Sequence, residues 1–134
     1  MRLKLCFIVL PVLLALDMVW LGLVASDLYQ RQIGHLMAPA PNWPAALAFY
    51  AIYIAGLVHF VLMPAVEHRS GGRVARDGAF FGFVAYATFD LTSLALLRGW
   101  PLAITLIDLA WGATLTATSA WLAFRFARLG SAAR

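Results

Sequence analysis

The sequence predicts an all-α fold: an integral membrane four-helix bundle with both ends of the chain on the cytoplasmic side. Three observations carry this prediction: an apolar composition, four long apolar segments, and basic residues gathered on one side of those segments. Of the 134 residues, 63% are hydrophobic and only 12% are charged, and the mean hydropathy is +0.85. Soluble domains are about 45–50% apolar and about 25% charged. We therefore expect residues 1–134 to form a single transmembrane domain.

The first expected span covers residues 5–26 and is preceded by a short basic start. A helix crosses the hydrocarbon core with roughly 20 mostly apolar residues, and this segment is long enough. The start resembles a signal peptide, but the apolar run is too long for a signal core and contains Asp17. We therefore expect a retained helix that continues to about Ile33, with Gly34 as its stop signal.

Three more spans follow, at residues 45–65, 78–97 and 101–124. The second and the fourth begin at a Trp-Pro pair, and proline fits the first turn of a helix. The second connection, EHRSGGRVARD, is charged and glycine-rich, whereas the third is the short RGW. The last two helices are therefore expected to be antiparallel neighbours. Gly78 and Gly82 give them a small-residue face for close packing.

The basic residues predict how the chain is oriented in the membrane. Cytoplasmic loops of membrane proteins carry an excess of lysine and arginine. Two of the ten basic residues, Arg31 and Arg98, fall on one side of the spans. The other eight fall on the side of the termini and the second loop: Arg2, Lys4, Arg69, Arg73, Arg76, Arg125, Arg128 and Arg134. We therefore expect a multi-pass protein of a bacterial inner membrane with both termini cytoplasmic.

Composition and motifs exclude several classes of function. The single cysteine, Cys6, rules out an internal disulfide and a cysteine-based metal cluster. The net charge of +4 comes from residues at the ends of apolar runs, which is unlike the basic helix or groove of a nucleic-acid-binding protein. His35 and His59 do not combine with the acids into a ligand set, so no metal site is expected. The sequence identifies no cofactor and leaves open whether the protein is an enzyme.

Three aspartates interrupt the apolar spans at a common depth. At the rise of a helix, Asp17 lies about 13 Å below the outer boundary of the membrane, and Asp90 and Asp108 lie about 10 Å below it. By the same rise, Tyr50 and Tyr53 of the second span lie about 9 to 13 Å below it. The first, third and fourth spans thus each contribute a carboxyl group to one layer in the outer half of the membrane. The second span contributes two phenols to the same layer.

Helical spacing places further polar and aromatic side chains beside these acids. On the third span, Tyr86, Asp90 and Ser93 share one face, because residues three and four apart are neighbours on a helix. The first and fourth spans each carry an aspartate followed three residues later by a tryptophan. Turning these faces inward gives a polar pocket with aromatic walls. Its expected lining is Asp17, Trp20, Tyr50, Tyr53, Tyr86, Asp90, Ser93, Asp108 and Trp111.

The energetic cost of the three acids favours a function, with interhelical hydrogen bonding as the alternative. An aspartate at the centre of a membrane helix costs about 2.5–3.5 kcal/mol, so three cost about 8–10 kcal/mol before they find partners. Hydrogen bonds between membrane helices average about 0.6 kcal/mol, which offsets little of that cost. Carboxyl groups held close together cannot all ionise cheaply, so we expect at least one of them to hold a proton.

Three short blocks around the aspartates resemble the signature of a known family. LDMVWLG in the first span, FDLTS in the third and DLAWG in the fourth are similar to blocks of a bacterial family of small four-helix inner-membrane proteins of unknown function. The resemblance covers nearly the whole chain and implies that the three aspartates are characteristic residues. In the third block the family pattern reads Tyr-Asp-Leu-Thr-Asn, where this chain has Phe89 and Ser93.

Three functions fit this sequence. The favoured one is a pocket that binds or processes a small apolar molecule, such as a lipid, an isoprenoid or a quinone, because apolar walls with a few convergent polar groups are typical of ligand sites. The second is translocation of protons or a small solute, since acids within membranes often mark relays. Four helices are few for a transporter, so this function requires a homo-oligomer. The third is a non-catalytic module that binds a partner protein through its basic cytoplasmic segments.

Overall fold

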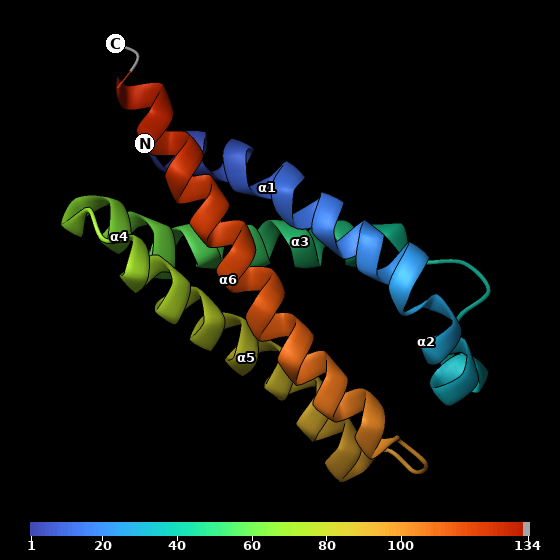
Figure 1. Cartoon of the computed structure of the whole chain (residues 1–134). Helices are drawn as coiled ribbons and strands as arrows, with labels where there is room; N and C mark the ends of the chain where they lie inside the picture. Colours follow the sequence, from blue (N-terminus) through green and yellow to red (C-terminus); the bar gives the residue numbers. More distant parts are fainter. Residues whose placement is uncertain (133–134) are drawn as a thin grey trace.

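The computed structural model describes residues 1–132, and no strand occurs among them (Figure 1). Four helical stretches are long and apolar enough to cross a membrane, which confirms the all-α class with four spans: Arg2–Val24, Trp43–His68, Gly71–Leu96 and Leu102–Ala132. Their elements are α1 (Arg2–Val19), a π-helical segment (Trp20–Val24), α3 (Trp43–Leu57), a second π-helical segment (Val58–Leu62), α4 (Met63–His68), α5 (Gly71–Leu96) and α6 (Leu102–Ala132). The first connection holds α2 (Ser26–Ile33) and a 3-10 turn (Gly34–Leu36).

The helices extend beyond the expected spans where the sequence becomes charged. The segment EHRSGGRVARD, expected as a connection, is almost entirely helical, because only Arg69 and Ser70 separate α4 from α5. Arg69 adopts the left-handed conformation (φ 51°), and the Ser70 hydroxyl accepts a hydrogen bond from the backbone N–H of Arg73 (3.2 Å). Hydropathy thus marks the apolar part of each helix, whereas capping sets its ends. The predicted cytoplasmic residue Arg134 lies outside the described residues.

The first connection differs from the expected continuous helix. A helix does end at Ile33, but it is α2, which is separate from α1 and turns away from the α1 axis (Figure 1). The backbone N–H of Ala25 donates to the carbonyl of Trp20 (2.8 Å), the wide hydrogen bond of a π-helical turn. The chain then bends at Ala25. This bend turns α2 back towards the bundle, where Tyr29 contacts α6.

The antiparallel helices α5 and α6 pack against each other along much of their length (Figure 1). Gly82 lies so close to α6 that an added Cβ atom would overlap the carbonyl oxygen of Gly112 and lie 2.7 Å from Cβ of Thr116. A Cβ atom on Gly112 would in turn overlap the ring of Tyr86. The close packing expected from Gly78 and Gly82 is therefore confirmed, and small residues are the usual means of bringing membrane helices together.

The two ends of the bundle have different cores. We call the end with the start of α1, the end of α6 and the α4–α5 turn the terminal end, and the end with α2 and the α5–α6 turn the loop end (Figure 1). Apolar and mostly aliphatic side chains fill the half towards the terminal end; fully buried examples are Leu5, Val9, Leu13, Leu57, Leu62 and Phe124. The half towards the loop end instead buries the polar side chains Asp17, Asp90, Ser93, Thr105 and Asp108. These residues come from α1, α5 and α6, and both α1 and α5 pack against α6.

Candidate functional site

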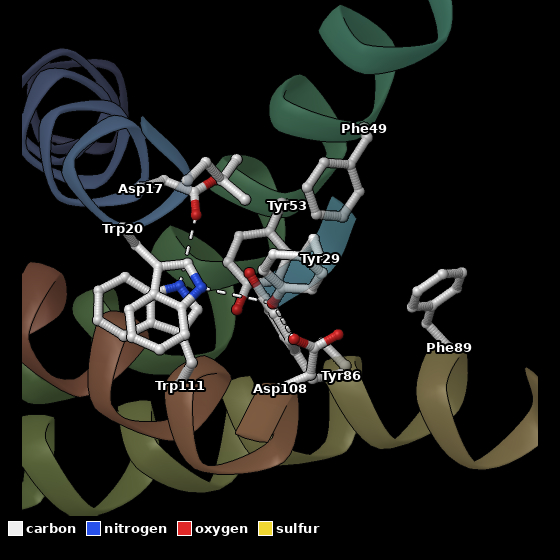
Figure 2. Close-up of a pocket in the computed structure, with 11 residues that line it drawn as sticks. Asp17, Trp20, Tyr29, Phe49, Tyr53, Tyr86, Phe89, Asp108 and Trp111 are labelled. Carbon is white, nitrogen blue, oxygen red and sulfur yellow. Dashed lines mark hydrogen bonds between the residues drawn. The ribbon is translucent and has the colours of Figure 1, made fainter. Parts of the chain in front are cut away.

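A cavity of about 270 Å³ lies in the half of the bundle towards the loop end. Its walls combine two carboxyl groups with seven aromatic rings, and α1, α2, α3, α5 and α6 all contribute (Figure 2). The lining residues are Asp17, Trp20, Leu21, Tyr29, Phe49, Tyr53, Ala85, Tyr86, Phe89, Asp108 and Trp111. Six of the nine residues expected in a pocket belong to this lining. The other three, Tyr50, Asp90 and Ser93, lie behind it or beside it.

Asp17 connects three helices at one side of the cavity. Its Oδ2 atom accepts a hydrogen bond from the hydroxyl of Tyr50 on α3 (2.6 Å), and its Oδ1 atom accepts a longer one from the indole N–H of Trp111 on α6 (3.4 Å). The side chain is only 7% exposed. The ring of Trp20 stacks on that of Trp111, with centroids 4.5 Å apart and planes 10° from parallel. Tyr50 therefore orients the acid from outside the cavity lining.

Asp108 occupies the other side of the cavity, where α2 meets α6. The hydroxyl of Tyr29 donates a short hydrogen bond to Oδ1 of Asp108, and the indole N–H of Trp20 donates to the Tyr29 oxygen (3.4 Å). Figure 2 shows this chain of three side chains across the cavity. Burial, together with the hydrogen bond to Asp108, raises the pKa of the Tyr29 phenol above its ordinary value. The phenol thus stays protonated and acts as a donor to the acid.

Two further tyrosines form the wall opposite the paired indoles. The hydroxyl of Tyr53 shares a hydrogen bond with the Thr116 hydroxyl (2.6 Å), which ties α3 to α6 just below the cavity. The ring of Tyr86 rests on the bare backbone of Gly112, which leaves no space for a side chain there. The glycine contact between α5 and α6 therefore brings Tyr86 to the cavity surface.

Asp90 is the most enclosed of the three acids. It is 0% exposed, and within residues 1–132 neither of its carboxyl oxygens has a hydrogen-bond partner. The group that faces it is the carboxyl of Asp108. Ser93 is buried on the same helix but does not line the cavity.

The three aspartates thus meet at the loop end in two groups. Asp17 is held by Tyr50 and Trp111, while Asp90 and Asp108 form a carboxyl pair. Within the part of the chain that the structure describes, His, Cys, Asp and Glu side chains are nowhere gathered in threes that could hold a metal ion. The arrangement can accept hydrogen bonds, hold a shared proton and attract positive charge.

Sequence reasoning missed five of the lining residues: Leu21, Tyr29, Phe49, Ala85 and Phe89. Tyr29 was placed in a polar connection, and its role depends on the bend at Ala25, for which the sequence carries no strong signal. Phe89 did have a signal, because it occupies a position in the FDLTS block where the related family pattern has tyrosine. Its side chain borders the cavity (Figure 2).

Residues 2–125 match a family described as predicted membrane protein (DUF2177). The protein belongs to this family. The match covers most of the chain and includes all three aspartate blocks, so the resemblance seen in those blocks is confirmed. No curated protein and no solved structure matches the chain.

Membership of the DUF2177 family shows an integral membrane protein and assigns it no activity. The matched residues include Asp17, Asp90 and Asp108, in the first, third and fourth spans. In this DUF2177 chain the same three helices bring those acids to one end of the bundle. The cavity and its acids are the features of the molecule from which a function can be inferred.

Proposed function

We propose that this protein binds a small, mainly apolar molecule in the cavity at its loop end. In the same proposal the chain lies in a bacterial inner membrane with both termini cytoplasmic, so that the loop end and the cavity face the outer half of the bilayer. Processing of the bound molecule by the carboxyl groups belongs to the same proposal. The single observation that carries it is a cavity of about 270 Å³ whose walls are mostly aromatic and contain two buried acids.

The lining has the composition of a ligand site. Such sites are concave and largely apolar, with a few polar groups that fix the orientation of the ligand. Here the apolar surface comes from the stacked pair Trp20 and Trp111 and from phenyl rings, while Asp17 and Asp108 provide the polar groups.

The cavity also has a route by which an apolar molecule can reach it. Phe49 on α3 and Phe89 on α5 border the cavity and are 48% and 58% exposed. Both belong to membrane-length helices, so the surface that exposes them faces lipid. An opening between these two rings would admit a molecule from the bilayer rather than from water. This supports a lipophilic ligand over a water-soluble one.

Translocation receives less support. A relay would have to continue towards the terminal end, and the core there consists of aliphatic residues such as Leu13, Leu57 and Val61. The buried polar side chains of α6 in that region, Thr116 and Ser119, do not continue to the terminal end among the described residues. Binding within the cavity therefore fits the single chain better than passage through it.

Binding can be tested with a fluorescent apolar probe. We expect 1-aminoanthracene, which is uncharged at neutral pH, to bind the wild-type protein in lipid nanodiscs saturably, with one site per chain. Ala85 lines the cavity, so Ala85→Trp should fill it and abolish the saturable signal. Ala51 lines a separate apolar groove between α1 and α3, so Ala51→Trp is the matched control and should bind like the wild type. Equal fluorescence from all three proteins would show only partitioning into lipid and would refute the proposal.

A further inference from the structure

We infer that the cavity selects an organic cation: an amine or quaternary ammonium group carried on an apolar body. This inference rests on the proposed binding function and specifies the chemical class of the ligand. It follows from two features of the same cavity, acids without a basic partner and a wall of electron-rich aromatic rings.

The acids around the cavity lack a counter-charge. Among residues 1–132 the ion pairs are those of Asp77 with Arg73 and Arg76, far from the cavity at the other end of α5. The lining contains no Lys, Arg or His. The hydrogen bonds made to Asp17 and Asp108 come from neutral phenol and indole groups. Buried charge is expensive unless it is paired, so a cation entering this space would supply the partner that the protein itself does not provide.

The aromatic rings favour the same ligand. The face of a tryptophan, tyrosine or phenylalanine ring attracts a cation within about 6 Å of its centre, most strongly where water is excluded. The stacked rings of Trp20 and Trp111 lie at one side of the cavity, with their indole N–H groups directed towards Tyr29 and Asp17 (Figure 2). Tyr29, Tyr53 and Tyr86 line the remaining sides. A neutral apolar molecule would gain contact area from these rings, but it would gain nothing from the carboxyl groups.

A third acid lies behind the cavity wall. Neither oxygen of Asp90 has a hydrogen-bond donor in the described chain, and the group that faces it is the carboxyl of Asp108. Two carboxyl groups close together repel each other when both are ionised. A cation that binds beside Asp108 would relieve that repulsion.

The first experiment compares two probes of the same shape. Benzyltrimethylammonium carries a permanent positive charge, and neopentylbenzene is its neutral carbon analogue. Both would be titrated against bound 1-aminoanthracene in nanodiscs, with Ala85→Trp as the background. We expect the cation to displace the reporter at a free concentration about tenfold or more below that of the neutral analogue.

Matched aspartate variants test whether the carboxyl groups cause the preference for the cation over its neutral analogue. Asn has nearly the shape of Asp, so Asp17→Asn and Asp108→Asn should still bind the neutral analogue while their preference for the cation drops by about tenfold or more. The control is Asp27→Asn, an exposed residue at the start of α2, which should retain the full preference. Retained binding of the neutral analogue shows that each variant is folded.

The outcomes separate the two proposals. Stronger binding of the cation that is lost in Asp17→Asn or Asp108→Asn supports the inference. Equal binding of the two probes, or stronger binding of the neutral one, overturns the inference and leaves the proposed binding function intact. Failure of both probes and of 1-aminoanthracene to bind saturably overturns both.

Discussion

The half of the bundle towards the terminal end is packed with aliphatic side chains, whereas the half towards the loop end holds acids, aromatic rings and a cavity. Leu5, Leu13 and Leu57 are fully buried in the first half. In the second half, Asp17 and Asp108 are almost as deeply buried but are held by hydrogen bonds from tyrosines and tryptophans. The same four helices thus run from a dense core into a polar, hollow one.

This difference shows how the chain can tolerate a costly region. Apolar side chains gain little from leaving lipid for one another, so membrane helices depend on close van der Waals packing. The terminal half and the glycine contact of α5 with α6 supply that packing. The loop half can then keep a cavity and buried acids, which lower stability, because the rest of the bundle holds the helices in place. Three variants test this division.

The largest effect is expected at the glycine contact. In Gly82→Leu the new side chain would collide with the backbone of Gly112 and with Thr116, so α5 and α6 must separate. We expect the free energy of unfolding to fall by about 3 kcal/mol or more, measured by titration with SDS in mixed micelles. Gly72→Leu is the control on the same helix, because a Cβ atom there meets nothing within 4 Å. Because leucine forms helices more readily than glycine, helix propensity alone predicts no loss in either variant. An equal loss in both variants would therefore show that the close contact at Gly82 is not its cause.

A smaller effect should separate the two halves directly. Leu57→Ala removes a fully buried side chain from the terminal half and should cost about 2 kcal/mol, because it creates a void. Ala85→Leu adds a side chain of the same kind to the cavity and should be neutral or stabilise the fold by about 0.5 kcal/mol. Both values come from the same SDS titration. Destabilisation of Ala85→Leu to the level of Leu57→Ala would mean that the cavity does not exist as free space in the membrane.

How much the sequence could predict depends on whether a feature is set by position along one helix or by contacts between helices. Hydropathy found the four spans, and helical rise placed Asp17, Asp90 and Asp108 in the same half of the bundle, because both depend on position along a single helix. Which face each helix presents depends on its neighbours, and the sequence could not decide that. Asp90 and Tyr86 share a face of α5 by spacing, yet only Tyr86 reaches the cavity. Asp90 instead faces the carboxyl of Asp108 on α6.

Tyr29 shows the other limit of the sequence. Its hydrogen bond to Asp108 joins residues 79 positions apart and requires α2 to fold back after the π-helical turn at Trp20–Val24. The hydropathy of a short polar connection contains no information about such a bend. A tyrosine three residues into a polar helix would usually be exposed, and here it is half-buried against an acid.

The smallest expected loss of stability concerns that hydrogen bond. Tyr29→Phe keeps the ring in the cavity wall but removes the donor to Asp108, so we expect a loss of about 1 kcal/mol in the free energy of unfolding. The loss should be local, because α2 carries few other contacts. Faster hydrogen exchange in residues 26–33, with little change in α5, would identify it. Unchanged exchange in α2 would mean that the ring alone holds this helix in place.

The same side chain gives the loop end a dependence on alkaline pH. Burial and the neighbouring Asp108 raise the pKa of the Tyr29 phenol above its usual value. Because the pKa is higher in the folded protein than in the unfolded chain, the contribution of Tyr29 to stability is complete below about pH 10, the ordinary pKa of tyrosine. It is lost as the pH rises from there through the folded-state pKa. Stability of the wild type should therefore fall more steeply above about pH 10 than that of Tyr29→Phe. Parallel curves for the two proteins would show that apolar contacts alone hold α2 against the bundle.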